Sequence, residues 1–254
     1  MRHAPFQASL NSSHLFYTTS PMPCPYFADR VERRVITELV GPDSQALHDQ
    51  LTRAGFRRSH GTAYAQACPG CNACIPIRVR AREFRPSRSQ RRIAKRNKEL
   101  VANEVSAIAN EEQFILFEAY QASRHAGGDM ETMEYSDYQS LVEENTIDTA
   151  LIEFRYNDRL VACIIVDKTS DGFSAVYSFF DTEFESRRSF GTFMVLWLIE
   201  HTRAIELDYV YLGFWINNCR KMTYKKDFQP LDYFLSGSWV PHEDIKKNEE
   251  IVGS

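Results

Sequence analysis

Short runs of alternating apolar and polar residues dominate the first hundred positions, and longer amphipathic stretches follow them. The alternation predicts strands over Val31 to Leu39, Phe56 to Gln66 and Ile75 to Phe84. Between the first two of these, Gln45 to Ala54 has leucines at helical spacing and ends at Gly55. We therefore expect a first compact unit from about Cys24 to about Leu100.

The second half of the chain has the pattern of an α/β unit. We expect helices at 111–126, 136–144 and 189–201, and strands at 149–156, 160–167, 173–181 and 209–214. Three antiparallel strands, a helix that begins near glycine and a further strand follow the order of the GNAT acyltransferase core. The sequence thus predicts an α/β (α+β) protein with a small Cys-rich N-terminal domain over 1–105. A GNAT-like domain with a C-terminal tail would occupy 106–254.

Length and composition are those of an ordinary globular protein. The chain has 254 residues, of which 43% are hydrophobic and 25% charged, so it can bury a full core. No run approaches the roughly 18 apolar residues of a membrane helix, and the N-terminus lacks the apolar run of a secretory signal. We expect a soluble cytoplasmic protein that does not engage a membrane.

The net charge of −4 conceals one concentrated basic strip. Ten of the 21 residues from Arg78 to Lys98 are basic and only Glu83 is acidic. The basic side chains lie on the polar face of a strand (Arg78, Arg80, Arg82) and on a following helix with a Ser87/Gln90 capping box (Arg88, Arg91, Arg92, Lys95, Arg96). A solvated charged face is the simplest interpretation. The preference for arginine and the periodicity over two elements favour a site for one polyanion, above all nucleic acid, with a small carboxylate as second ligand.

Three of the six cysteines form the run Cys68-x2-Cys71-x2-Cys74. Together with Cys24 they would complete a four-thiolate zinc or iron–sulfur site. The alternative is a turn whose cysteines pack as small hydrophobes. The sequence leaves both interpretations open.

Three further motifs have candidate roles. Ser189-Phe190-Gly191 at a helix start can hold a phosphate with backbone N–H groups, or is an ordinary helix start. Asp181 at a strand end can hold an amine, or caps the strand. Trp215 can line an apolar pocket, or belongs to the core.

Longer strings of residues carry a family resemblance. The N-terminal ones are Cys24-Pro25-Tyr26, Arg53 to Ser59, the cysteine run continued to Pro76 and Arg78, and Phe84-Arg85-Pro86-Ser87-Arg88. The C-terminal ones are Tyr177 to Asp181, Ser189-x-Gly191, Tyr211 to Ile216 and Lys221-Met222-x-Tyr224-Lys225. Over about residues 22 to 235 the chain resembles the aminoacyl-tRNA–protein transferases, most closely the bacterial aspartate/glutamate leucyltransferases, which are kin to the eukaryotic arginyl-tRNA–protein transferases.

The resemblance implies transfer of leucine from leucyl-tRNA to proteins with N-terminal Asp or Glu, which marks them for regulated proteolysis. No cofactor is needed for the transfer, because the donor ester is already activated. We expect Tyr64 and Asp181 as catalytic residues, and the metal ligands, if any, to be Cys24, Cys68, Cys71 and Cys74. The expected substrate-binding residues are Arg78, Arg80, Arg88, Arg91, Arg92, Ser189, Gly191 and Trp215. Among these, Arg78 is the foremost candidate to bind the acceptor carboxylate.

Three alternatives remain open at this level. Arginine rather than leucine can be the transferred residue, since the chemistry is the same. An acyl-CoA-dependent GNAT acetyltransferase would use the Ser189 helix start for pyrophosphate, but it leaves the basic strip unexplained. A non-catalytic, metal-containing nucleic-acid-binding protein would leave the α/β half without a role. The sequence indicates neither the oligomeric state nor the target proteins.

Overall fold

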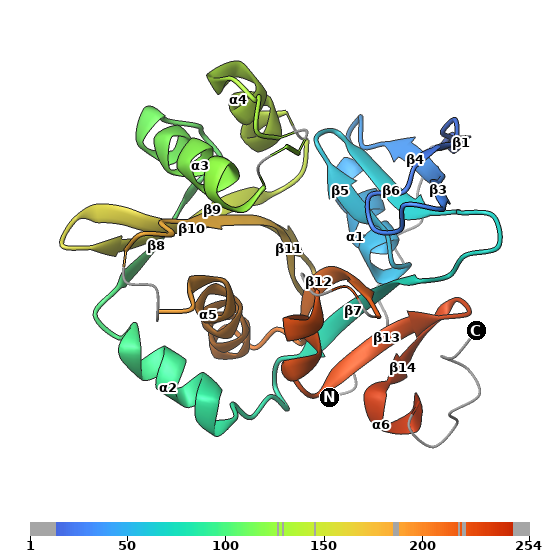
Figure 1. Cartoon of the computed structure of the whole chain (residues 1–254). Helices are drawn as coiled ribbons and strands as arrows, with labels where there is room; N and C mark the ends of the chain where they lie inside the picture. The colour runs from blue at the N-terminus through green and yellow to red at the C-terminus, as the bar shows by residue number, and fades with distance from the viewer. Residues whose placement is uncertain are drawn as a thin grey trace.

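The computed structural model describes residues 14–125, 127–128, 130–144, 146–184, 188–217, 219 and 222–245. Its main feature is an eight-stranded sheet in the order β14-β13-β7-β12-β11-β10-β9-β8 (Figure 1). Neighbouring strands are antiparallel, except that β11 and β12 are parallel. The strands are β7 (Cys74–Arg80), β8 (Val101–Ser106), β9 (Thr149–Tyr156), β10 (Arg159–Thr169), β11 (Gly172–Phe180), β12 (Tyr209–Ile216), β13 (Leu231–Leu235) and β14 (Ser238–Pro241).

Helices cover both faces of this sheet (Figure 1). Helices α3 (Glu111–Arg124) and α4 (Tyr135–Glu143) pack on one face over a core that includes Phe117, Tyr138 and Phe179. Helix α5 (Phe190–Ala204) packs on the other, where Met194 and Leu198 lie completely buried. The sheet is thus apolar on both sides, which explains the nearly continuous burial of β9 and β10.

A smaller unit precedes β7 in the chain. It is a four-stranded sheet in the order β1-β4-β6-β5, with helix α1 (Ser44–Arg53) packed on it through Leu47 and Leu51. The four strands are β1 (Tyr17–Thr18), β4 (Arg34–Glu38), β5 (Arg57–Ser59) and β6 (Thr62–Gln66). A two-stranded ribbon of β2 (Met22–Pro23) and β3 (Val31–Glu32) lies beside it.

Most of the expected elements are confirmed. The GNAT-like order is present: the antiparallel strands β9, β10 and β11, then α5, then the parallel strand β12. Asn157 and Asp158 both have left-handed backbone angles in the β9–β10 turn, as a tight hairpin requires. The capping box of Ser87 and Gln90 starts helix α2 (Arg88–Arg96). The short helix α4 begins one residue before the expected cap, because Glu134 and Asp137 form its capping box.

The expected division at residue 105 does not separate the sheets. Strand β7 lies in the large sheet between β12 and β13, and β8 forms its edge beside β9. Helix α2 packs against α5. Local alternation showed that β7 is a strand, but which sheet it joins depends on residues more than a hundred positions further along. Among the described residues, no helix is both long and apolar enough to cross a membrane.

Candidate functional site

A pocket of about 560 Å³ opens where β11 ends and α5 begins. Its floor is aromatic and its rim is polar, with one guanidinium from α3. It brings together three of the residues predicted from the sequence, Asp181, Ser189 and Gly191. The other lining residues are Tyr120, Arg124, His125, Ser178, Phe180, Thr182, Phe190, Thr192 and Tyr224. We call this cavity the transfer pocket.

The start of α5 supplies backbone donors to the transfer pocket. Ser189 precedes the helix in a left-handed conformation (φ 55°), and the Phe193 N–H donates the first intrahelical bond to the Ser189 carbonyl at 2.9 Å. The N–H groups of the first turn, including those of Gly191 and Thr192, are therefore not used inside the helix. Such a turn favours an anionic or carbonyl oxygen. The expectation of an oxygen-binding helix start is consistent with this geometry.

Asp181 holds the turn that follows β11. Its Oδ1 accepts hydrogen bonds from the backbone N–H groups of Glu183 (2.8 Å) and Phe184 (2.9 Å), and its Oδ2 is paired with Arg159. Both carboxylate oxygens are thus engaged within the fold. This arrangement supports the capping interpretation of Asp181 more than a role in holding a substrate amine.

The basic helix α2 exposes one face, while Gln90 on its other face is buried. Arg88, Arg91 and Arg92 all lie at the surface. In the part of the chain that the structure describes, they make no ion pair with a carboxylate. The helix has no acidic residue in its first turn, so its positive N-terminal end is not offset. This surface is therefore free to bind a polyanion.

Helix α2 is tied at its two ends to different parts of the fold. The Asn97 side chain donates to the Arg188 carbonyl at 2.8 Å, directly before Ser189 and the start of α5. At the other end, the Gln90 side chain donates to the Asp227 carbonyl at 3.0 Å. The C-terminal end of α2 is consequently fixed next to the start of α5 and the transfer pocket.

The alternation predicted one wholly cationic face for Arg78, Arg80 and Arg82. In the structure all three guanidiniums are paired with carboxylates. The Arg78 guanidinium pairs with Asp232 at 3.0 Å and stacks 3.6 Å over the ring of Tyr209, and its side chain is only 12% exposed. Arg80 pairs with Glu83 at 3.3 Å and Glu243 at 2.5 Å, and Arg82 pairs with Asp208 at 2.6 Å. Carboxylates from β13 and α6 (His242–Ile245) thus neutralise both guanidiniums and favour a structural role, and substrate binding by Arg78 and Arg80 stays a prediction.

Tyr64 and Trp215 lie outside the transfer pocket. Tyr64, on β6, packs its ring 6.0 Å from that of Phe214 and under the Arg34 guanidinium at 4.8 Å. Trp215, on β12, lines a second pocket of about 880 Å³ with Arg85, Lys226 and Tyr233. The Trp215 Nε1 is buried there without a hydrogen-bond partner among the described residues. The expectation that Trp215 lines a pocket is thus consistent with the structure, whereas Tyr64 is not among the residues that line the transfer pocket.

The four cysteines of the expected metal site gather around one loop, as free thiols. Burial and the nearby Cys68, Cys24 and Cys71 raise the pKa of Cys74 to about 12. The Arg30 guanidinium donates a hydrogen bond to the Cys71 Sγ at 3.2 Å, so this sulfur already has a cationic partner. Within the described ranges, no three His, Cys, Asp or Glu side chains are placed to bind one metal ion. As they lie, these residues do not fit a metal, and we assign no chemical step to one.

Sequence reasoning missed Lys225 as a notable residue. Its Nζ donates to the carbonyls of Leu212 and Phe214, both at 2.8 Å, under the floor of the site. Burial, together with the nearby Arg57 charge, lowers the pKa of Lys225 to about 7. The motif Lys221-Met222-x-Tyr224-Lys225 was visible in the sequence, but nothing local to it indicates that the lysine turns inward.

Comparison with known proteins identifies the family. Residues 22–92 match the family model for the N terminus of arginine-tRNA-protein transferase, and residues 112–235 match the model for its C terminus. An aspartate/glutamate leucyltransferase from Paramagnetospirillum magneticum is 53% identical over 91% of this chain and 94% of its own length. Another from Gluconacetobacter diazotrophicus is 51% identical over 93% of this chain and 91% of its own.

Solved structures are more distant. The L-PGS of Bacillus licheniformis is 10% identical, with a TM-score of 0.46 over 73% of this chain and 54% of that one. A GCN5-related glucosamine N-acetyltransferase region of a fungal β-N-acetylglucosaminidase is 12% identical, with a TM-score of 0.36 over 70% of this chain and 21% of that one. We base no argument on either likeness. From the two family models and the near-full-length relatives, the chain belongs to the aspartate/glutamate leucyltransferases of the arginine-tRNA-protein transferase family.

Proposed function

We propose that this protein moves leucine from leucyl-tRNA to the N-terminus of proteins that begin with Asp or Glu. The names of the relatives support both the donor and the acceptor residues. Aminoacyl-tRNA is made and used in the cytoplasm, so we expect the reaction there. The product carries an N-terminal leucine, and we expect it to be passed to N-degron-dependent proteolysis.

One observation carries the site assignment: the transfer pocket adjoins the exposed basic helix α2. The link from Asn97 to Arg188 places the end of α2 beside the start of α5. In this arrangement the arginines of α2 would hold phosphates of the tRNA acceptor stem. The 3′-terminal leucyl ester would then enter the transfer pocket. The backbone N–H groups at the start of α5 would receive its oxygen atoms.

The lining of the transfer pocket favours leucine over arginine as the transferred residue. Tyr120, Phe180 and Phe190 give an apolar floor, with ring centroids 4.9 Å apart for Tyr120 and Phe180. Of the described residues that line it, Asp181 is the one carboxylate, and Arg159 is already paired with it. The guanidinium of a transferred arginine would therefore lie near Arg124 without a free carboxylate to balance its charge. The isobutyl group of leucine is uncharged and needs no such partner.

The reaction itself needs positioning more than a covalent intermediate. The acceptor α-amine attacks the ester carbonyl, an amide bond forms, and the ribose hydroxyl of the tRNA leaves with a proton from the amine. An α-amine has a pKa of about 7.7–8.0, so a fair fraction is neutral near pH 7. Holding amine and ester together can supply a large part of the roughly 7–11 kcal/mol available from proximity.

A transfer assay tests the proposal directly. Purified protein is incubated with labelled leucyl-tRNA and peptides that differ only in an N-terminal Glu or Gln. We expect labelled leucine on the Glu peptide and little on the Gln peptide. Parallel reactions contain arginyl-tRNA or labelled acetyl-CoA in place of leucyl-tRNA. Efficient transfer from either of these, or none from leucyl-tRNA, would contradict the proposal.

A further inference from the structure

Strands β11 and β12 separate after a short parallel contact. Their pairing covers only Gly172–Ser174 against Tyr209–Tyr211. Directly beyond it, each strand has an irregularity in the pairing with its other neighbour. On β10–β11 the register shifts between Ile165 and Val166, and on β7–β12 it shifts between Tyr211 and Gly213. Such bulges bend strands, and here they leave main-chain carbonyls facing the gap.

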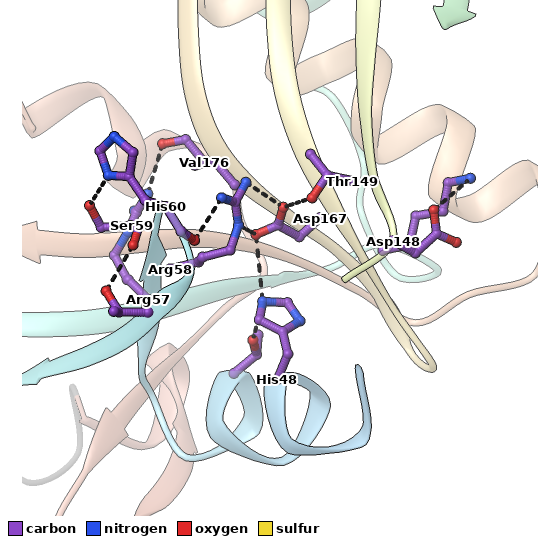
Figure 2. Close-up of polar contacts among 12 residues, drawn as sticks. His48, Arg57, Arg58, Ser59, His60, Asp148, Thr149, Asp167 and Val176 are labelled. Carbon is purple, nitrogen blue, oxygen red and sulfur yellow. Dashed lines mark hydrogen bonds and ion pairs between the residues drawn. The ribbon is translucent and has the colours of Figure 1, made fainter. Parts of the chain in front are cut away.

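A guanidinium from the smaller unit fills this gap. Arg57, on β5, donates from Nη2 to the Val176 carbonyl at 2.9 Å (Figure 2). From the same Nη2, Arg57 also donates to the Ala175 carbonyl at 3.2 Å. Its Nη1 donates to the Leu212 carbonyl on β12 at 3.4 Å. One side chain thus bridges both strands, with the planar fork that distinguishes arginine from lysine.

The backbone of β12 is shaped to admit this arginine. Gly213 has φ +69°, and a Cβ placed on it would lie 1.2 Å from the Arg57 Nη1. No side chain fits there while Arg57 is in place. Glycine at this position therefore serves both the left-handed conformation and the close approach of the guanidinium.

Lys225 closes the other side of the gap. Its Nζ bonds to the same Leu212 carbonyl as Arg57, and also to Phe214. Two basic side chains therefore share one acceptor, and after burial the Arg57 charge is the next cause of the lowered pKa of Lys225. The four carbonyls stabilise the arrangement, because each accepts a hydrogen bond from Arg57, from Lys225 or from both.

This pair adjoins two residues that line the transfer pocket. Tyr224, which lines the pocket, is the neighbour of Lys225 in the chain, and Ser178 lies two residues after Val176. The Arg57 charge also acts on Tyr224, lowering the pKa of a phenol that burial otherwise raises. Any change in the spacing of β11 and β12 would consequently move the pocket wall.

We propose that Arg57 and Lys225 are positioning residues for leucyl transfer: together they set the separation of β11 and β12 and thereby the shape of the transfer pocket. This inference rests on the proposed function. It also gives the smaller unit a part in the reaction, since one of its side chains completes the floor of a pocket in the large sheet.

The test compares two arginines of the smaller unit that both reach the large sheet. Arg57→Ala removes the bridge. Arg53→Ala is the matched control, because Arg53 also contacts the large sheet, at Ser170 and Asp171, but at the far end of β11. For each variant we would measure the kcat and KM of leucyl transfer, leucyl-tRNA affinity and the thermal midpoint. Guanidinium ion at millimolar concentration is then added, with urea as the uncharged analogue.

We expect Arg57→Ala to lower kcat about 10- to 100-fold, because small misplacements of reacting groups have large effects. Leucyl-tRNA affinity should stay near that of the wild type, since α2 is untouched. Guanidinium should restore kcat and urea should not, while Arg53→Ala should transfer leucine normally. If Arg57→Ala does not fold, Lys225→Met carries the test, because it keeps the volume of the side chain and should lower kcat in the same way.

Three results would overturn the inference. The first is wild-type kcat in Arg57→Ala or, where that variant does not fold, in Lys225→Met. The second is an equal loss in Arg53→Ala, which would indicate general docking of the smaller unit. The third is a loss that guanidinium leaves unchanged and that follows the fall in thermal midpoint. A wild-type protein with no leucyl transfer would instead refute the proposed function.

Discussion

Arg58 and Asp167 form a two-pronged ion pair inside the protein, with Nε to Oδ2 and Nη2 to Oδ1 both at 2.8 Å (Figure 2). Both side chains are completely buried, and the pair joins β5 of the smaller unit to β10 of the large sheet. Thr149 donates to the same carboxylate at 2.8 Å, and His48 lies 3.5 Å from it. Despite complete burial, these partners lower the pKa of Asp167 to about 2.

Breaking this pair from one side should be strongly destabilising. We expect Arg58→Met to lower the free energy of unfolding by about 3–5 kcal/mol, because Asp167 is then buried without its counter-charge. Urea unfolding checks the value. The double variant Arg58→Met with Asp167→Asn should lose less than Arg58→Met alone. A single variant as stable as the wild type would show that the pair does not hold the two sheets together.

The exposed arginines of α2 predict a salt-dependent affinity for tRNA. Replacing Arg88, Arg91 and Arg92 by alanine should weaken binding, and it should flatten the plot of log K against log salt by roughly one for each lost phosphate contact. Arg203→Ala, at the exposed end of α5, is the control and should leave the slope unchanged. If the triple variant keeps the wild-type slope, the tRNA binds another surface of the protein.

The partners of Arg78 change the expected effect of replacing it. From the sequence, Arg78→Ala should spoil recognition of the acceptor carboxylate. Because Asp232 pairs with Arg78 and Tyr209 covers it, we now expect the loss to appear in stability. The preference for Glu over Gln peptides should stay at its wild-type ratio. A lower preference for Glu peptides, in a variant of unchanged stability, would indicate that Arg78 binds the acceptor carboxylate.

The low pKa of Lys225 predicts how stability depends on pH. Its pKa is about 7 in the folded protein and 10.5 without burial, so between these values the unfolded chain binds a proton that the folded chain has released. The free energy of unfolding therefore rises with pH from about 7 to 10.5. Below pH 7 the full cost of burying the charged Lys225 ammonium applies, on the order of 3–5 kcal/mol.

Lys225→Met should remove that slope. In urea titrations at several pH values, the unfolding free energy of the wild type should rise relative to that of the variant as the pH rises above 7. A difference that stays constant from pH 6 to pH 9 would mean that Lys225 is charged in the folded protein.

The cysteine loop allows a test of the metal expectation. If metal draws Cys24, Cys68, Cys71 and Cys74 together and displaces Arg30, anaerobically purified protein should contain stoichiometric zinc, or iron with sulfide. Cys71→Ser should then lose it. Active protein with neither metal on elemental analysis would leave the loop as four thiols.

Local patterns predicted the elements well and the contacts between them less well. Ile77 and Val79 alternate with Arg78 and Arg80, which correctly placed a strand with one buried face. The same pattern suggested that the arginine face meets solvent, because Asp232 and Glu243, which neutralise it, follow more than 150 residues later. The helix start at Ser189 was visible from its short motif.

The inward turn of Lys225 and the bridge made by Arg57 were not visible. Both depend on carbonyls exposed by bulges, and a bulge is a property of strand pairing. A single stretch of sequence does not encode which neighbour a strand will have.

The place of β7 in the large sheet has a consequence during synthesis on the ribosome. This apolar strand is complete at Arg80, but its neighbours β12 and β13 begin only at Tyr209 and Leu231. At about 5–20 residues per second, its two edges wait on the order of ten seconds for their partners. The nascent chain therefore carries β7 without either of its sheet neighbours for about half of its synthesis, and we expect ribosome-associated chaperones to bind it during that time. It also means that a fragment that starts after β7 lacks an interior strand of its own sheet.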